Sequence, residues 1–282
     1  DAKERAARRR ARKVAKKIAQ DIAGDIKVFV NDAVPLMHLI CTKGIKERHW
    51  EEVRTITGLD VQVDSSTGLA QMLAINLQHH VNSIEDTCVA AAKENGLETR
   101  LNQMEKAWEA IHFETKEHRG SHKLTGIDDI QNELDDQIVQ TQAMRSNRYI
   151  KPFEARAEAW ERDLTALQDI IDNWLKVQAT WMYLEPIFSS DDIMRQLPTE
   201  GKRFVGVDRT WRKMLGQAAN DPDAISFCKT PRLLPAFTDS NVMLEMVQKG
   251  LTEYLETKRA AFARFYFLSN DELLEILSQS KD

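Results

Sequence analysis

The sequence predicts a mainly α-helical fold, an elongated array of antiparallel helical bundles with one small β-hairpin insertion. Three observations support this class. Apolar residues recur at alternating spacings of four and three through the middle of the chain, as on the buried face of a long packed helix. Only 11 Gly and 7 Pro occur in 282 residues, which is few for a β-sandwich or barrel. A hydrophobic fraction of 42% and a charged fraction of 29% fit a folded protein with a substantial core.

The longest predicted helix begins after Pro152, or slightly before it, and ends near Glu185-Pro186. At about 1.5 Å per residue it spans roughly 50 Å. A helix of this length serves a mechanical or positional role more readily than it shapes a small-molecule pocket. Eight of its ten seam positions are apolar; the ten are Phe153, Ala157, Trp160, Leu164, Leu167, Ile171, Trp174, Gln178, Trp181 and Glu185.

Gln178 and Glu185 are the two polar residues of this seam. A polar residue at such a position usually fixes the register of packed helices at some cost in stability. Glu185 could instead be solvated near the helix end, or paired with an arginine across the bundle. A structural role is favoured over a chemical one for both side chains.

Helices are also predicted before this seam. The first runs from near residue 3 to about Asn31, where Val34-Pro35 breaks it. A short helix follows Gly44 and stops at Gly58. A third spans about 67–95 and ends at Asn95-Gly96, and a fourth continues from Leu97. The residues expected to face inward in the short helix are Ile45, Trp50, Val53 and Ile56.

The helical period is lost between His112 and Thr125. The turn-forming sequence Arg119-Gly120-Ser121 lies at the centre of this segment. We therefore predict a small β-hairpin over about 112–125. Helical periodicity resumes at Ile127.

Shorter elements are predicted after Pro186. Ser189 or Ser190 caps a short helix that stops at Pro198, and a further helix follows. The proline-punctuated stretch 222–235 holds short pieces at most, and Asp239 or Ser240 starts the next helix. Residues 265–268 are expected to form a buried extended link, and Ser269 with Glu272 a capping box. Inward positions of the two longer helices are Phe204, Val207, Trp211 and Leu215, then Leu244, Val247, Leu251, Leu255 and Phe262.

The charge is distributed unevenly along the chain. Residues 1–17 hold nine Lys/Arg and two acids, a local charge of +7, whereas the whole chain carries −5. Such a stretch could contact nucleic acid, an acidic lipid surface or an acidic partner. It could also be the solvated face of a helix whose apolar stripe is Val14, Ile18, Ile22, Ile26 and Phe29. We favour the solvated face, because no aromatic residues alternate with the basic ones.

No motif for chemistry emerges. The segment Thr199–Arg203 resembles a phosphate-binding loop but lacks its first glycine and the Ser/Thr after the lysine. His118 and His122 flank a predicted turn and lack the glutamate of a helical zinc motif. The acidic pairs Asp128-Asp129 and Asp191-Asp192 fall in first turns of predicted helices, where negative charge is favourable. We predict no catalytic residue, cofactor or metal site in this chain.

Two further classes are not supported. No apolar run approaches the length of a membrane span, so a membrane is not a predicted partner. Nucleic acid is not a predicted partner either, because no aromatic residues alternate with the basic ones near the start of the chain. Cys41, Cys88 and Cys228 are far apart and odd in number, which favours reduced, partly buried thiols of a cytosolic protein.

The stretch Trp174–Ile193 resembles the signature of the dynein heavy chain linker, also termed N-terminal region 2. Other segments, before and after this stretch, resemble the same family and occur in the family's order. They are Pro35-Leu36, Arg48–Trp50, Leu124–Gln137, Leu197-Pro198 and Phe265–Leu277. The sequence Phe267–Glu272 is closer to axonemal heavy chains, of the flagellar inner-arm type. The signature residues are Trp174, Gln178, Trp181, Tyr183, Glu185, Pro186, Phe188, Asp208 and Trp211.

The resemblance implies a lever. The dynein linker lies across a ring of six AAA+ modules, joins the tail to the first module, and bends and straightens to drive the power stroke along microtubules. ATP and Mg belong to the ring, so this fragment is expected to be non-enzymatic. Its implied partners are the ring of the same heavy chain and the tail with its associated subunits. Microtubules are reached only through the full motor, in the cytoplasmic cytoskeleton of a cilium or flagellum axoneme.

The resemblance also implies a domain organisation. Residues 1–34 form a basic, tail-proximal helix, and 35–282 a linker that is incomplete at its C-terminus. The Pro186 corner and the stretch 222–235 are candidate compliant points, although the hinge could equally sit in a kink of the long helix. Ring-docking residues are not indicated. The alternative is a non-enzymatic helical cytoskeletal scaffold or tether of the spectrin-like kind, whose helices would recur at a fixed length.

Overall fold

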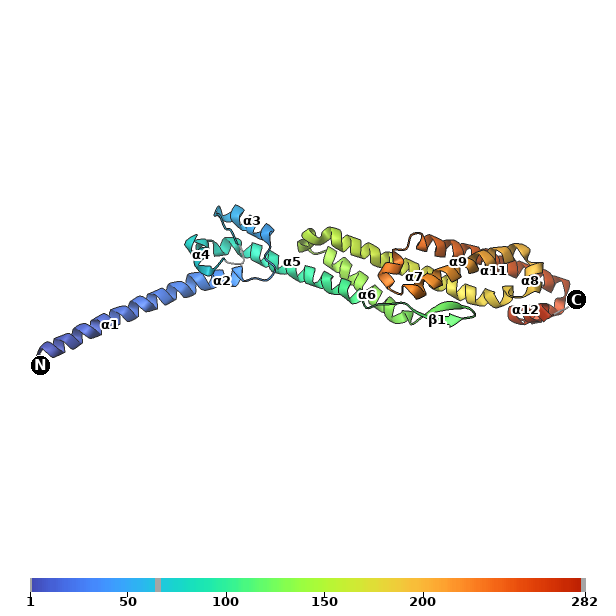
Figure 1. Cartoon of the computed structure of the whole chain (residues 1–282), viewed down its shortest axis with the longest axis horizontal. Coiled ribbons are helices and arrows are strands. Elements are labelled where there is room, and N and C mark those ends of the chain that lie inside the picture. Colours follow the sequence, from blue (N-terminus) through green and yellow to red (C-terminus); the bar gives the residue numbers. More distant parts are fainter. Residues whose placement is uncertain (1, 64–66, 280–282) are drawn as a thin grey trace. The chain divides into compact units, whose positions relative to one another are not determined.

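The computed structural model describes residues 2–63 and 67–279, which form helices and one β-hairpin (Figure 1). The predicted mainly α class with a hairpin insertion is confirmed. The chain divides into two compact units, one of residues 1–100 with 147–153 and the other of 101–146 with 154–282.

The first unit begins with a helix that does not end where it was predicted to. Helix α1 (Ala2–Val28) passes into the π-helical turn η1 (Phe29–Ala33) and then α2 (Val34–Ile40). The wide turn is closed by the Val34 N–H, which donates to Phe29 O. Pro35 is therefore in the first turn of α2, where its missing N–H costs little.

Helices α3 (Glu47–Thr57) and α4 (Leu69–Ala74), the 3₁₀ turn η2 (Leu77–His80) and the start of α5 (Val81–Trp108) form the rest of this unit with η3 (Arg148–Phe153). Gly58 ends α3 with φ 67°, as predicted. The prediction that Ile56 faces inward is wrong, because this side chain is 46% exposed. The core residues are Leu36, Trp50, Val53, Val61, Met72, Leu77 and Ile84.

The start of α3 is joined to α5 by charged side chains. Arg48 and His49 both bind Glu94, and the His49 Nε2–Glu94 Oε2 distance is 3.0 Å. His49 Nδ1 accepts the Lys46 N–H, so Nε2 carries the ring proton. Lys46 Nζ lies 2.7 Å from a Glu98 oxygen.

Two predicted helix boundaries in this region are wrong. The helix expected over 67–95 is interrupted at Asn76, which has φ 63°. At Asn95-Gly96 the helix does not stop, since α5 continues to Trp108. A single interior glycine costs only about 1 kcal/mol. Contacts from the start of α3 hold Glu94 and Glu98, which lie on either side of Asn95-Gly96, so tertiary contacts support the continued helix.

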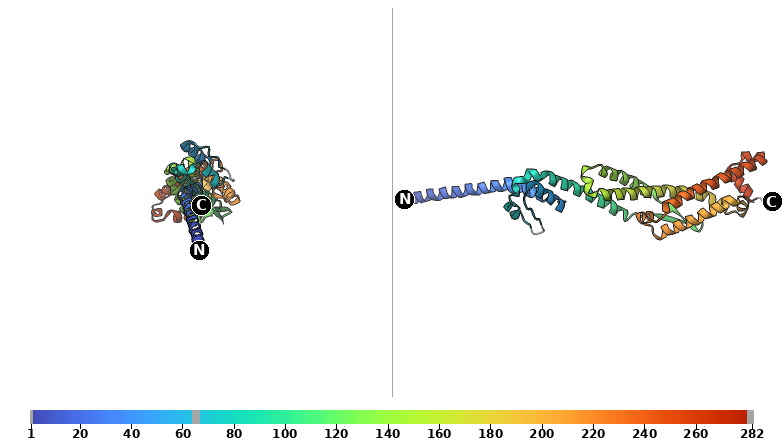
Figure 2. Two further views of the ribbon diagram at one scale, coloured as in Figure 1. Left: turned by 90° about the vertical axis from the view of Figure 1, so that its left-hand side faces the viewer. Right: turned by 90° about the horizontal axis from the view of Figure 1, so that it is seen from above.

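The second unit is built around α7 (Glu154–Phe188). It also contains α6 (Ile127–Arg145), α8 (Asp191–Gln196), α9 (Pro198–Asn220), α10 (Ala224–Cys228), α11 (Leu233–Ala261) and α12 (Asn270–Gln279). Helices α6, α9 and α11 all pack on α7, and α9 also packs on α11 (Figures 1 and 2). Arg145 at the end of α6 pairs with Glu158 and Glu161, and Asp135, earlier in α6, accepts a hydrogen bond from Gln168, later in α7. Helices α6 and α7 are therefore antiparallel.

Helix α7 buries the predicted seam. The seven apolar seam positions from Ala157 to Trp181 are all buried. A second row, Ile170, Val177, Leu184 and Phe188, is buried as well, because neighbouring helices cover α7 on more than one side. The helix ends at Phe188, three residues beyond the predicted end at Glu185, since Pro186 in its last turn removes only one helical hydrogen bond.

The last part of the chain departs from prediction twice. Helix α11 starts at Leu233 and not at Asp239, because Pro235 fits the first turn of a helix. The link expected to be buried and extended is the exposed 3₁₀ turn η4 (Ala263–Phe267), in which Phe267 is 90% exposed. Arg259 holds this turn by donating to the carbonyls of Phe265 and Leu268.

Two further predictions concern the ends of α11 and α12. Phe262 is exposed and not inward, unlike the four earlier positions of α11. The predicted capping box is confirmed: Ser269 N–H donates to Glu272 Oε2 at 2.8 Å, and Glu272 N–H donates to Ser269 Oγ at 3.2 Å.

Candidate functional site

The predicted hairpin is present. Strands β1 (Glu114–His118) and β2 (Ser121–Thr125) pair antiparallel, from Glu114 opposite Thr125 to His118 opposite Ser121. Arg119 and Gly120 form the two-residue turn with φ 51° and 69°. Two positive φ values in succession are the geometry of a type I′ turn, which matches the twist of a hairpin. Arg119 adopts this disfavoured conformation in a place where its side chain is held.

Gln178 joins the long helix to the hairpin. Leu124 N–H donates to Gln178 Oε1 at 2.7 Å, and Gln178 Nε2 donates to Leu124 O at 3.0 Å. The side-chain amide thus binds the backbone of β2 as a neighbouring strand would. Gln178 therefore fixes the position of the hairpin on α7, a structural role as expected, although its partner is a strand and not another helix.

Glu185 pairs with an arginine, which was one of the two alternatives left open for it. Arg119 Nη1 lies 2.6 Å from Glu185 Oε2. The side chain of Glu185 is 13% exposed and that of Arg119 is 52% exposed. The hairpin turn, and not a facing helix, supplies the partner.

Asp208 connects α7, α9 and the hairpin turn. Trp181 Nε1 donates to Asp208 Oδ1 at 3.0 Å, and Arg212 Nε donates to both carboxylate oxygens at 3.0 and 2.9 Å. Arg212 Nη1 then donates to Gly120 O at 2.9 Å. Trp181 stacks on Trp211 with ring centroids 5.5 Å apart.

The base of the hairpin is fixed to the segment before α10. Phe113 N–H donates to Pro222 O at 2.8 Å, and His112 forms an isolated bridge with Asp223. The Phe113 ring packs edge-on against Trp174 at 5.2 Å. We call the polar group that binds strand β2 and the turn the hairpin clamp; it consists of Arg119, Leu124, Gln178, Trp181, Glu185, Asp208 and Arg212.

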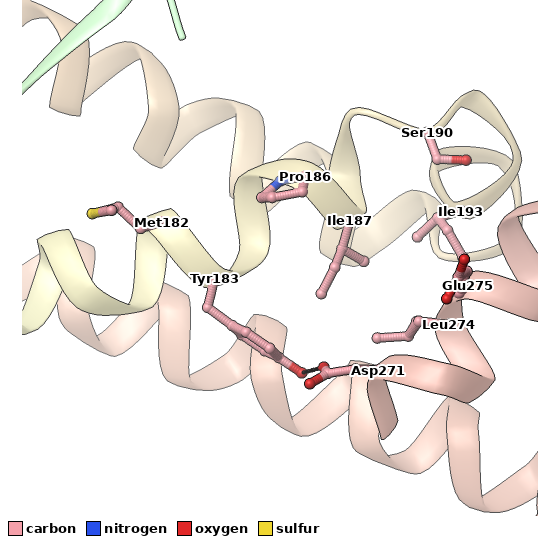
Figure 3. A pocket seen from close by; sticks show the side chains of 9 residues that line it. All are labelled: Met182, Tyr183, Pro186, Ile187, Ser190, Ile193, Asp271, Leu274 and Glu275. Carbon is pink, nitrogen blue, oxygen red and sulfur yellow. Dashed lines mark hydrogen bonds between the residues drawn. The ribbon is translucent and has the colours of Figure 1, made fainter. Parts of the chain in front are cut away.

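The remaining signature residues lie near the end of α7. Tyr183 and Pro186 line a cleft between α7, α8 and α12 (Figure 3). The Tyr183 hydroxyl lies 3.4 Å from Asp271 Oδ1. Burial, and then the negative charge of Asp271, raise the pKa of Tyr183, so the phenol stays neutral and donates. Phe188 stacks on Phe204 at 5.2 Å.

The contacts of the signature residues hold helices and the hairpin in place. They bring Gln178, Trp181, Glu185, Asp208 and Trp211 together around the hairpin, whereas Tyr183 and Pro186 belong to the cleft. Within residues 2–63 and 67–279, no group of three or more His, Cys, Asp or Glu could hold a metal ion. No helix in the described parts of the chain is both long and apolar enough to cross a membrane.

Sequence reasoning missed Arg212 and the clamping role of Arg119. One signal was available for Arg212: it stands four residues after Asp208, the spacing at which opposite charges meet on a helix. No local signal marks Arg119, because its partner lies 66 residues further along the chain.

The fold and the clamp define a helical structural segment, in which a long central helix and a hairpin are held together by polar side chains. The family model described as Dynein heavy chain, N-terminal region 2 matches residues 2–282. The chain therefore belongs to the dynein heavy chain family, within its N-terminal region 2.

Curated relatives are axonemal heavy chains. Mouse dynein axonemal heavy chain 3 is 43% identical and mouse dynein axonemal heavy chain 1 is 45% identical, each over 251 residues. Human dynein axonemal heavy chain 12 is 46% identical over 240 residues. The alignments cover 88%, 88% and 84% of this chain but only 6%, 6% and 8% of those proteins. The resemblance to axonemal dynein heavy chains is thereby confirmed.

Proposed function

We propose that this chain forms part of the mechanical linker of an axonemal dynein heavy chain, bending and straightening over the AAA+ ring in the power stroke. The segment itself is non-catalytic, and ATP and Mg act in the ring. Its partners are that ring and the tail with its subunits, and it reaches microtubules only through the full motor in a ciliary or flagellar axoneme. Family membership and the axonemal relatives support this assignment.

The observation that carries the proposal is the construction of α7. This helix has 35 residues and buries apolar side chains along most of its length. Helices α6, α9 and α11 cover it, and the hairpin clamp ties it to α9. A lever needs stiff bodies joined at a few compliant points. A helix supported on several sides meets the first requirement.

The proposal includes the division into a tail-proximal segment, 1–34, and a linker segment, 35–282. It retains one of the two predicted compliant points. Pro186 lies inside α7 and forms no corner. The stretch 222–235 holds the five-residue α10 and, from Leu233, the first residues of α11, and it remains the candidate.

Glycine substitutions in α7 test the lever in the full-length heavy chain. The double substitution Ala166→Gly with Ala179→Gly changes two exposed positions of α7. Each substitution should lower the stability of the helix by about 1 kcal/mol. We expect the microtubule gliding velocity to fall several-fold while the microtubule-stimulated ATPase rate is retained, because force is lost in a softened helix.

The matched control is Ala219→Gly with Ala260→Gly, at exposed positions in the last turns of α9 and α11. This variant should glide as the parent does. Normal gliding by the α7 variant at a normal ATPase rate would contradict the lever. The scaffold alternative is disfavoured because α6, α7, α9 and α11 have 19, 35, 23 and 29 residues, with no fixed repeat length.

A further inference from the structure

Helix α1 carries a sequence pattern with a period of four residues. Four consecutive segments each begin with Ala and end with Val or Ile: Ala11–Val14, Ala15–Ile18, Ala19–Ile22 and Ala23–Ile26. In a helix, residues four apart form one row along the surface. The pattern therefore creates two neighbouring apolar rows. The alanine row consists of Ala11, Ala15, Ala19 and Ala23, and the branched row consists of Val14, Ile18, Ile22 and Ile26.

Both rows are open to solvent. All residues from 8 to 31 are exposed, and the four residues of the branched row are between 52% and 58% exposed. An amphipathic helix ordinarily buries its apolar face against another element. Contiguous exposed apolar rows on such a helix therefore mark an interaction surface.

The geometry of the rows restricts the partner. With 3.6 residues per turn, a row of every fourth residue moves round the helix by about 40° per step. A lipid surface contacts one fixed face of a helix, and a coiled coil needs an average apolar spacing of about 3.5 residues. Two helices that pack along their four-residue rows instead cross at about −50°. The rows therefore favour a helix that crosses α1, and the small alanine side chains allow a close approach.

Charged side chains flank the branched row in a self-complementary order. This flank consists of Lys13, Lys17, Asp21 and Asp25, two cations followed by two anions. Within the described part of the chain, these four side chains form no ion pair or hydrogen bond. An antiparallel copy of the same row would place Lys17 beside Asp21 and Lys13 beside Asp25, each pair occurring twice. The charges therefore complement those of an identical helix.

The flank beside the alanine row accepts the same arrangement. It consists of Arg12, Lys16, Gln20 and Gly24. In an antiparallel pair, the cations of this flank face the uncharged Gln20 and Gly24 of the second copy, so no like charges meet. A parallel pair would bring the cations of one flank against those of the other, which is unfavourable. The charge order therefore favours the antiparallel orientation.

We propose that α1 binds α1 of a second copy of this chain, antiparallel and crossing near Ala19. The two apolar rows form the contact, and Lys13 and Lys17 of each copy pair with Asp25 and Asp21 of the other. A single helix crossing is smaller than a standard interface of about 1,600 Å². The dimer is therefore weak and depends on concentration. This inference goes beyond the lever and does not depend on it.

Sedimentation equilibrium of this chain measures the dimer. We expect a monomer–dimer equilibrium that Ile18→Ala with Ile22→Ala weakens several-fold. Alanine is a better helix former than isoleucine, so unfolding of α1 would not account for that loss. The matched control, Val205→Ala with Val242→Ala, changes exposed apolar residues of α9 and α11 and should leave the equilibrium unchanged.

Charge reversal tests the orientation. Lys13→Glu with Lys17→Glu, and separately Asp21→Lys with Asp25→Lys, should each weaken self-association several-fold, because like charges then face each other. An equimolar mixture of the two variants should form a heterodimer, since four attractive pairs are restored.

The control for charge is Arg12→Glu with Lys16→Glu. It changes the net charge as much as the lysine variant does, but on the flank that faces uncharged residues, so it should have little effect. Three results would overturn the proposal: a chain that is monomeric at every concentration, self-association that is insensitive to the isoleucine substitutions, or a mixture of charge variants that does not associate. Binding of a monomeric chain to phosphatidylserine vesicles would assign the apolar rows to a lipid surface and would also overturn it.

Discussion

At the scale of single residues, Gln178 has the clearest consequence. It supplies both a donor and an acceptor to Leu124 in a partly buried place. Removing a partner from such groups costs more than the net value of the hydrogen bond, because the groups left behind are desolvated and unpaired. Removing the Gln178 side chain should therefore destabilise the fold more than removing an amide side chain from the surface.

Gln178→Leu should lower the free energy of unfolding by about 1–3 kcal/mol, since two backbone groups lose their partner. Denaturant unfolding of the isolated chain measures this change. Gln168→Leu, which removes a hydrogen bond to Asp135 at an exposed site, is the control and should have a smaller effect. Equal effects of the two substitutions would argue against the role of Gln178 in the clamp.

The cysteines should differ in reactivity. Burial, with the charges of Asp163 and Asp223, raises the pKa of Cys228 to about 12. Burial also raises the pKa of Cys88, with a further contribution from Glu85. Because the thiolate is the reacting form, iodoacetamide at mildly alkaline pH should label exposed Cys41 first. Peptide mapping should find Cys228 labelled fully only after denaturation; labelling of native Cys228 at the rate of Cys41 would contradict its burial.

At the scale of elements, the hairpin turn is held from two sides. Glu185 binds the Arg119 side chain, and Arg212 binds the Gly120 carbonyl. The first contact is partly solvated, so its contribution must be discounted for screening. The turn therefore depends on several modest contacts.

A double-mutant cycle with Arg119→Met and Glu185→Gln should give a coupling energy of about 0.2–1 kcal/mol, the range of partly exposed ion pairs. Thermal unfolding of the four proteins measures it. The coupling should shrink at high salt, because exposed charges are screened. A coupling of zero at low salt would show that the ion pair contributes nothing to the clamp.

Helix α12 should become less stable in acid. Hydrogen bonds from the Ser269 N–H and then its hydroxyl lower the pKa of Glu272 from its ordinary 4.5. A depressed carboxyl pKa stabilises the fold above the unfolded pKa, and this stabilisation is lost as the pH falls below about 4.5 through the folded pKa.

Hydrogen exchange of the α12 amides should therefore show protection, corrected for intrinsic rates, that decreases between neutral pH and about pH 3. Glu272→Gln provides the comparison, since it keeps a hydrogen-bonding side chain but cannot titrate. If the substituted chain shows the same pH dependence, another group is responsible.

At the scale of the whole molecule, the proposed lever depends on α7 being supported along its length. In the second unit, α7 contacts α6, α8, α9, α10 and α11, and also strand β2 of the hairpin. The glycine variants of α7 address this scale, because they soften the helix without removing a side-chain contact. A lower gliding velocity at an unchanged ATPase rate would show that the substitutions impair the transmission of force and not ATP hydrolysis.

Much of this fold could be predicted from the sequence because the signals are local. The spacing of Trp160 to Trp181 reflects the period of a helix with one buried face, and Arg119-Gly120 satisfies the backbone of a hairpin turn. Ser269 and Glu272 form their capping box within one turn. The signature in the last third of α7 was sufficient to predict the family that the comparison confirms.

Tertiary structure decided what local rules leave open. The helix continues through Asn95-Gly96, where the start of α3 binds Glu94 and Glu98 on either side. Residues 263–267 form a turn in which Arg259 binds the carbonyls of Phe265 and Leu268. Gln178 and Glu185 were identified as unusual, but their partners Leu124 and Arg119 lie 54 and 66 residues away. Sequence periodicity determines which face of a helix is buried, whereas the fold brings distant donors and acceptors within hydrogen-bonding distance.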